Sequence, residues 1–235
     1  MKLEVKGLIE SSLLDWDGKI VSTIFLPGCN FRCPYCYNHK LVLAPKKMRT
    51  IPLNRIKRHL LKHGDFIDGV CITGGEPTIH KDLPELLREI KGLGFLVKLD
   101  TNGSNPEMLQ HLIDERLVDY IAMDLKAPLK FAKYKKATNK NPNLKNLKKS
   151  INIIMSSGIG YEFRTTVVPT IVELDDIPEI GKAVKGAKRI VFQQFVPKDA
   201  MNNKLREIKP YNREDVERFA AKALKYVHDL RIRGQ

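Results

Sequence analysis

Residues 20–38 read IVSTIFLPGCNFRCPYCYN. The first seven residues, 20–26, form an apolar run of strand length, and a Pro-Gly pair ends it. Three cysteines follow within eight residues at the spacing C-x3-C-x2-C: Cys29, Cys33 and Cys36. This stretch therefore predicts a buried strand that carries a cluster of thiols at its C-terminal end.

The clustered thiols indicate a metal site rather than a disulfide framework. Four cysteines in 235 residues are too few for a disulfide scaffold, and Cys71 stands alone in an apolar stretch, as a small buried residue would. A structural zinc site needs four ligands, and the fourth would have to be His39 or a distant residue. Three ligands without a clear fourth predict an iron–sulfur cluster with one iron open to a substrate or cofactor. A zinc site is the alternative.

Outward from this stretch, strands alternate with helices. Strands are expected at 3–9, 20–26, 69–73, 95–99, 120–123, 161–168 and 189–194, and helices at 53–62, 82–91, 107–115, 144–156, 177–185 and about 213–231. Two long irregular stretches are expected at 41–52 and 130–149. Alternation of this kind means a parallel sheet with right-handed crossovers. A full eight-unit barrel typically needs about 250 residues. Six units therefore predict an α/β fold, an incomplete TIM-like (βα)6 barrel in a single domain 1–235, with its core at about 18–200.

Polar side chains follow the predicted strands at their C-terminal ends, where the working groups of such folds gather. They are Gly74, Gly75 and Glu76, then Asp100, Thr101 and Asn102, then Asp124 and Lys126. The strand at 161–168 carries Arg164, and the strand at 189–194 ends at Gln194. A carboxylate can meet an amine, two neighbouring carboxylates favour a shared cation, and Lys or Arg can bind a carboxylate. The set fits a ligand with an amino acid head group. Turn geometry for the glycines and ion pairs for the charged residues are the alternatives.

These motifs resemble a known family. C-x3-C-x2-C with Tyr35 before the third cysteine resembles the signature of the radical S-adenosylmethionine superfamily, and GGEP at 74–77 is similar to its motif for the methionyl amine. DTNG at 100–103 paired with DLK at 124–126 resembles the glycyl-radical-enzyme activases. SLLDWDGK leading into FLPGCNFRCPYCYN most resembles the activating proteins of anaerobic ribonucleoside-triphosphate reductase. The resemblance covers roughly residues 10–200.

The resemblance implies a function. Cys29, Cys33 and Cys36 would hold three irons of a [4Fe-4S] cluster, and the fourth iron would bind S-adenosylmethionine. Reductive cleavage of that cofactor would generate a glycyl radical on a partner enzyme, the anaerobic ribonucleotide reductase. A flavodoxin or ferredoxin would supply the electron. No second cysteine cluster follows, which implies the single-cluster kind.

The resemblance also implies roles for single residues. Gly74, Gly75 and Glu76 would meet the methionyl amine, and Lys126 would lie near the carboxylate. Asp100, Thr101 and Asp124 would bind a monovalent cation beside it. Asn102, within the same motif, is counted with the cofactor-binding positions. Tyr35 and Asn38 would lie near the adenine or ribose, while Arg164 and Gln194 are assigned by strand position alone.

Composition limits the partners. Lys and Arg number 41 against 27 acids, a net charge of +14, which suits an RNA, an anionic cofactor or an acidic protein, or simply a lysine-rich solvated surface. The lysine stretch 130–149 holds only Phe131 and Tyr134 as aromatic residues, so nucleic acid is not expected as a partner.

The N-terminal residues lack an apolar signal core, and no stretch reaches the roughly 18 apolar residues of a membrane span. A cytoplasmic protein is expected. The rival functions are a radical enzyme modifying tRNA or a small molecule, and a zinc or iron–sulfur carrier.

Overall fold

Eight strands are hydrogen-bonded in chain order, from β1 to β8, in the computed structural model, which describes residues 3–234. The strands are β1 Gly7–Ser12, β2 Val21–Leu26, β3 Gly69–Gly74, β4 Leu96–Thr101, β5 Tyr120–Asp124, β6 Gly160–Val167, β7 Arg189–Gln194 and β8 Asp229–Arg233. The α-helices are α1 His39–Leu43, α2 Leu53–Lys62, α3 Leu83–Gly92, α4 Pro106–Asp114, α5 Phe131–Thr138, α6 Leu144–Ser156, α7 Asp176–Ala183, α8 Asn203–Arg206 and α9 Arg213–Ala221. Short 3₁₀ turns occupy Pro45–Lys47, Pro77–Ile79 and Leu224–Tyr226.

The sheet is mostly parallel. β1 pairs with β2 in the antiparallel sense, whereas β2–β3–β4 and β6–β7–β8 pair in parallel. β1 and β8 stand at the two ends of the strand order, and within residues 3–234 no pairing joins them. The predicted α/β class with an open, mostly parallel sheet is confirmed.

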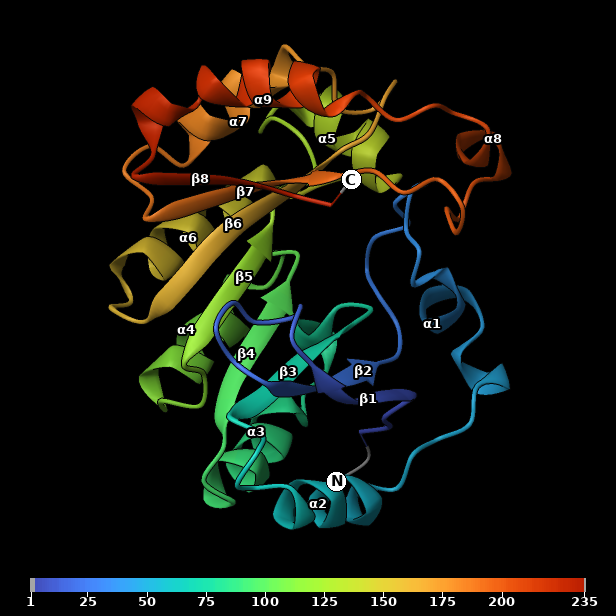
Figure 1. Ribbon diagram of the computed structural model, residues 1–235, viewed down its shortest axis with the longest axis vertical. Coiled ribbons are helices and arrows are strands. Elements are labelled where there is room, and N and C mark those ends of the chain that lie inside the picture. Colours follow the sequence, from blue (N-terminus) through green and yellow to red (C-terminus); the bar gives the residue numbers. More distant parts are fainter. Residues whose placement is uncertain (1–2, 235) are drawn as a thin grey trace. The chain divides into compact units, whose positions relative to one another are not determined.

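The chain folds as two compact units. The first contains the residues up to 30, 38–101 and 107–121, and the second contains 31–37, 102–106 and the residues from 122 onward. In the first unit, β2, β3 and β4 supply fully buried aliphatic side chains such as Val21, Ile72 and Leu99. In the second unit, α7 and α9 lie side by side along β6, β7 and β8 (Figure 1).

Local sequence explains where several helices begin. The Asn143 side chain accepts hydrogen bonds from the backbone N–H groups of Lys145 and Asn146 at the start of α6. The Asn212 side chain accepts a hydrogen bond from the N–H of Asp215 at the start of α9. Side-chain caps of this kind satisfy N–H groups that lack partners in the first turn of a helix. α2 has the bounds that its apolar spacing predicts, and Ile56 and Leu60 are its buried residues.

Four predictions about secondary structure were wrong. The C-terminal helix does not run over 213–231, because α9 ends at Ala221 and residues 229–233 pair with β7 as strand β8. The stretch 130–149 contains α5 before the helix that was correctly predicted at 144–156, and 41–52 contains the end of α1 and a 3₁₀ turn. The first strand is Gly7–Ser12 rather than 3–9, because its pairing with β2 sets its bounds. Among the described residues, no helix has the length and apolar character that crossing a membrane requires.

Candidate functional site

In the first unit, the loop that begins the cysteine motif is joined by backbone hydrogen bonds to the loop after β3. The N–H of Glu76 donates to the carbonyl of Gly28 at 2.8 Å, and the N–H of Gly75 donates to the carbonyl of Leu26 at 2.9 Å. A Cβ on Gly75 would lie 1.6 Å from the Gly28 carbonyl oxygen, and at Gly74, which has φ +117°, a Cβ would lie 2.5 Å from backbone atoms of Leu26. Only glycine fits at either position. Backbone packing therefore requires a glycine at both positions.

Glu76 is held in a defined position. The residue is 1% exposed, and its Oε1 accepts hydrogen bonds from the N–H of Thr78 at 3.1 Å, the Thr78 hydroxyl at 2.5 Å and the Thr101 hydroxyl at 2.7 Å. The Asn38 amide donates to the Gly74 carbonyl at 3.1 Å. Four predicted positions, Asn38, Gly74, Glu76 and Thr101, are thus brought together. Thr78 was not predicted, although a hydroxyl two residues after Glu76 suits a local turn.

Asp100 lies beside a buried lysine that the sequence analysis missed. Lys98 is 2% exposed, and its Nζ lies 3.5 Å from Asp100 Oδ1. The same ammonium donates to the carbonyl of Asp15, whose carboxylate accepts from the Thr23 hydroxyl at 2.6 Å. Trp16 from the same loop packs against Tyr120 with ring centroids 5.6 Å apart. A lone lysine within the apolar run 95–99 is the signal that could have revealed it, because a buried charge requires partners.

In the second unit, Asp124 lies between two cations. Lys126 Nζ donates to Asp124 Oδ2 at 2.9 Å, and Arg164 Nε donates to Oδ1 at 2.8 Å. The side chains of Lys126, Asp124 and Arg164 are 19%, 26% and 11% exposed. Burial acts to raise the pKa of Asp124, but Arg164 and Lys126 outweigh it and lower that pKa to about 2. Burial acts to lower the pKa of Lys126, but Asp124 raises it well above its usual range.

The ion pairs of Asp124 concern the prediction that this residue helps to bind a monovalent cation. Each carboxylate oxygen of Asp124 already contacts a side-chain cation. Two neighbouring carboxylates favour a bound cation only where nothing else neutralises them. Lys126 and Arg164 therefore supply for Asp124 the positive charge that the sequence analysis assigned to an ion.

Tyr35 presents a buried hydroxyl. The residue is 7% exposed, and its hydroxyl has no hydrogen-bond partner among the described residues. Burial raises the pKa of Tyr35, and the groups that act on it electrostatically are Cys33, Lys126, Tyr134 and Asp124. Buried polar groups in folded proteins nearly always have a partner. This orphaned hydroxyl beside the Asp124 ion pairs fits the prediction that Tyr35 meets a ligand.

The segment that carries Cys33 and Cys36 is held from two sides. The N–H of Arg32 donates to the Thr138 carbonyl at the end of α5 at 2.8 Å, and the N–H of Asn202 donates to the Pro34 carbonyl at 2.8 Å. Within the segment, the N–H of Cys36 donates to the carbonyl of Cys33 at 3.0 Å. These contacts fix a tight turn between two of the three motif cysteines.

Among the described residues, no three His, Cys, Asp or Glu side chains are grouped to hold a metal ion. A zinc site needs all its ligands at one ion, whereas the thiolates of an iron–sulfur cluster bind different irons. The assignment of Cys29, Cys33 and Cys36 as cluster ligands stays a prediction from the motif.

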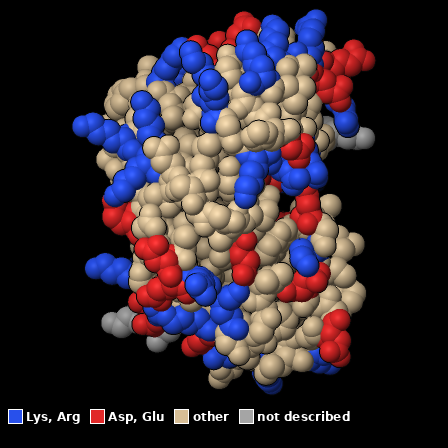
Figure 2. Space-filling model, turned by 90° about the vertical axis from the view of Figure 1, so that its left-hand side faces the viewer, with Lys and Arg blue, Asp and Glu red and all other residues tan. Residues whose placement is uncertain are grey.

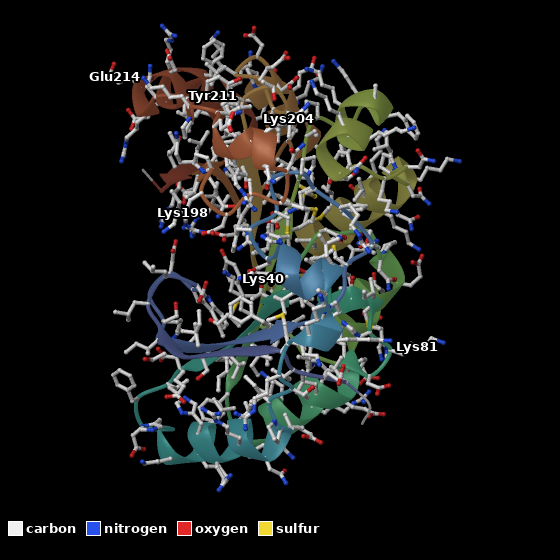
Figure 3. The ribbon with its side chains drawn as sticks, turned by 90° about the vertical axis from the view of Figure 1, so that its right-hand side faces the viewer. Lys40, Lys81, Lys198, Lys204, Tyr211 and Glu214 are labelled. Atoms are coloured by element: carbon white, nitrogen blue, oxygen red, sulfur yellow. The ribbon has the colours of Figure 1, made fainter. Side chains whose placement is uncertain are left out.

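Asn102 and Gln194, which were predicted to bind the cofactor, make hydrogen bonds to neighbouring backbone groups. Asn102 Oδ1 accepts from the N–H of Ser104 at 2.9 Å, which makes it a turn residue. Gln194 donates through Nε2 to the carbonyl of Tyr211, and Figure 3 labels Tyr211 together with Lys198 and Lys204 on the segment after β7. These contacts give each residue a structural role in its own segment.

Comparison with known proteins identifies the family. Residues 23–184 match the Radical SAM superfamily. A protein of Methanocaldococcus jannaschii with a provisional name as a glycyl-radical enzyme activating enzyme is 36% identical over 99% of this chain and 97% of its own length. A second protein of that organism, named in the same way, is 31% identical over 68% of this chain and 61% of its own length.

A solved structure supports the fold. Streptococcus suis SuiB bound to S-adenosylmethionine has a TM-score of 0.66 at 16% identity, and the match covers 90% of this chain and 52% of SuiB. At this identity, the likeness concerns the fold only. The sequence match and the fold agree, and the chain belongs to the radical SAM superfamily, whose enzymes use a [4Fe-4S] cluster and S-adenosylmethionine.

Proposed function

We propose that this enzyme is a glycyl-radical-enzyme activating enzyme and that its partner is an anaerobic ribonucleoside-triphosphate reductase. The relative that is 36% identical over 99% of the chain carries the activating-enzyme name. The run SLLDWDGK followed by FLPGCNFRCPYCYN supports the choice of reductase. When bound, the cluster and S-adenosylmethionine supply the one-electron cleavage that ends in removal of a hydrogen atom from a partner glycine.

The observation that carries the proposal is the group formed by Tyr35, Asp124, Lys126 and Arg164. An ammonium group has three N–H donors, and the contact with Asp124 uses one of them. Lys126 can therefore bind a ligand carboxylate while it remains paired. The elevated pKa of Lys126 keeps its charge throughout the physiological pH range. The orphaned Tyr35 hydroxyl would donate to a polar group of the same ligand.

Lys126 is proposed to bind the carboxylate of the ligand, and Glu76 is proposed to bind its amino group. Thr78 and Thr101 donate to a single carboxylate oxygen and so orient the carboxylate. A carboxylate fixed in this way attracts an amine without having to reorganise. We assign the amino group of S-adenosylmethionine to the loop of Gly74, Gly75 and Glu76, and its carboxylate to Lys126. Cys29, Cys33 and Cys36 are the proposed cluster ligands, and clustered thiols of this kind belong in the reducing cytoplasm.

The test of cofactor chemistry is 5′-deoxyadenosine formation by anaerobically reconstituted, dithionite-reduced protein given S-adenosylmethionine. We expect product from the wild type and none from Cys33→Ala. Cys71→Ala is the matched control, because Cys71 is fully buried in β3 and lies outside the motif. It should retain product formation. Product from Cys33→Ala equal to that of the wild type would contradict the ligand assignment.

The test of the partner is electron paramagnetic resonance of a purified anaerobic ribonucleotide reductase mixed with this enzyme, S-adenosylmethionine and reductant. A doublet signal from a glycyl radical, absent with Cys33→Ala, is the expected result. Formation of 5′-deoxyadenosine without a radical on the reductase would refute this choice of partner. It would favour the rival function, modification of a tRNA or small molecule.

A further inference from the structure

Net charge alone does not locate a docking surface. Basic side chains occur over the whole height of the face in Figure 2, with acidic ones among them. One segment of the second unit is different: residues 130–149 contain eight lysines and no Asp or Glu. Lys130 and Lys133 form ion pairs with carboxylates of the segment 173–179.

Five further lysines of this segment are exposed, and the described contacts include no ion pair for them: Lys135, Lys136, Lys140, Lys145 and Lys148. We call them the α5–α6 lysine surface. Their charges stand together on the chain without an acidic residue between them. The surface therefore suits an acidic partner.

The surface is built on ordered helices. Tyr134, Ala137 and Thr138 are fully buried on one side of α5, which leaves Lys135 and Lys136 on the other. α5 ends at Thr138 and is followed by Asn139, a left-handed residue with φ 49°; Lys140 lies in the short connector, and α6 begins after its cap Asn143. Charges on packed helices keep their positions, so they can match the pattern of a partner.

α5 also holds the cysteine segment. The N–H of Arg32 donates to the Thr138 carbonyl at 2.8 Å, and the Phe31 ring meets the Tyr134 ring edge-on with centroids 6.3 Å apart. The helix that presents lysines to solvent is thus the helix that packs against the residues just before Cys33. A partner bound to this surface would be placed close to Cys33.

We propose that the α5–α6 lysine surface binds the enzyme's electron donor, a small redox protein with an acidic surface. The inference rests on the proposed function, which requires one electron from outside. In that step the reduced donor loses one electron and the cofactor held by the motif cysteines gains it. No bond forms or breaks, and no proton moves. Opposite charges increase the rate of encounter and orient the two proteins.

RNA is the other polyanion that lysines could bind, and the surface suits it less. Binding of single-stranded RNA uses exposed aromatic rings on which bases stack. Among the aromatic residues of 130–149, Tyr134 is fully buried, and Phe131 alone is exposed, at 51%. A redox partner must also bind near the cysteine segment, against which α5 packs, whereas an RNA has no such requirement.

The experiment compares two double charge reversals of the reconstituted enzyme. Lys135→Glu/Lys136→Glu changes the surface, and Lys182→Glu/Lys185→Glu makes the same change in net charge at exposed lysines of the α7 region. The probe is a purified acidic ferredoxin. Its binding is followed by fluorescence anisotropy, and the oxidation of its reduced form by absorbance. Formation of 5′-deoxyadenosine with dithionite is measured in parallel for the wild type and both variants.

We expect the first variant to lose at least about tenfold in ferredoxin affinity and oxidation rate at about 0.05 M salt, and the difference to shrink at about 0.5 M salt. The second variant should resemble the wild type, and both should match the wild type with dithionite. Lys135→Gln/Lys136→Gln, which removes charge without reversing it, should show a smaller loss. Equal behaviour of the two reversals would overturn the proposal. So would a first variant that loses binding of fluorescent tRNA, measured by the same anisotropy method, without losing ferredoxin binding.

Failure of the proposed function has a different signature. If the wild type forms no 5′-deoxyadenosine with dithionite, the function is wrong, whereas the anisotropy measurement still reports on the surface. A wild type that binds no ferredoxin at low salt, yet forms product with dithionite, would overturn the docking inference alone.

Discussion

The ion pairs of Asp124 allow a stability prediction with a defined pH dependence. Asp124→Asn keeps the shape of the side chain and removes the charge that Lys126 and Arg164 contact at 2.9 and 2.8 Å. The pKa of Asp124 falls from 3.8 to about 2 in the folded protein. A tenfold change in an equilibrium constant is about 1.4 kcal/mol, so this difference favours folding of the ionised form by about 2 kcal/mol.

The sign of the pH dependence follows from the lowered pKa. A carboxyl group whose pKa is lower in the folded state stabilises the protein above its unfolded pKa, near 4. That contribution declines as the pH falls through the folded pKa, near 2. The variant should therefore be less stable than the wild type by about 2 kcal/mol at pH 7 and by roughly 1 kcal/mol at pH 3.

Urea unfolding followed by circular dichroism, under anaerobic reducing conditions at pH 7, 5 and 3, measures this difference. Asp199→Asn is the control, because Asp199 is an exposed residue of the same unit and should change stability by less than about 0.5 kcal/mol. Equal destabilisation by Asp124→Asn at pH 7 and pH 3 would refute the electrostatic reasoning. So would a loss at pH 7 no larger than that of the control.

Two further substitutions test the packing and the buried charge. Gly75→Ala would place a Cβ 1.6 Å from the Gly28 carbonyl oxygen and should lower the unfolding free energy by about 3 kcal/mol, whereas nothing lies within 4 Å of an added Cβ at Gly92. In calorimetry, Gly92→Ala should be as stable as the wild type or more stable. A similar loss of unfolding free energy in Gly75→Ala and Gly92→Ala would contradict the steric argument. Arg233→Met removes two 2.8 Å hydrogen bonds to Glu162, which is 1% exposed, and should cost about 3–5 kcal/mol. Adding Glu162→Gln should restore part of that loss in urea unfolding, and no recovery would argue against an ion-pair cost.

Much of the fold could be predicted because the apolar runs are long and uninterrupted. β2, β3 and β7 begin and end within a residue of the runs at 20–26, 69–73 and 189–194. The C-terminal prediction failed because residues 213–221 do form a helix, and nothing nearby shows that it ends. Strand β8 is only five residues long, and it is stabilised by pairing with β7, a contact distant in the sequence. Local periodicity does not report such contacts.

The lysine-rich stretch shows a second limit. α5 has only eight residues, and its buried side is Tyr134, Ala137 and Thr138, a spacing of three and four that is typical of a helix. Lysines between these positions hid the pattern. The segment 130–149, which was expected to be irregular, is therefore a largely helical part of the surface.

The site was predictable at the level of motifs and not of contacts. Most of the polar motifs lie at or just after the C-terminal end of a strand, as expected for this fold class, whereas Arg164 lies within β6. The partners of each side chain could not be derived, since Asp124 could have faced a bound ion or the two protein cations it does face. Lys98 was overlooked because a lysine in an apolar strand contradicts the usual distribution of charge.

The loop at 13–20, which joins β1 to β2, has a consequence for the design of chimeras. Its Asp15 carbonyl accepts a hydrogen bond from Lys98 in the middle of β4, so exchanging the loop alone would change the acceptor of a buried ammonium. A successful exchange between relatives should need residue 98 to be transferred with the loop. Across relatives, we expect the length of this loop and the residue at position 98 to vary together, with an apolar residue at 98 wherever the loop is too short to present a carbonyl.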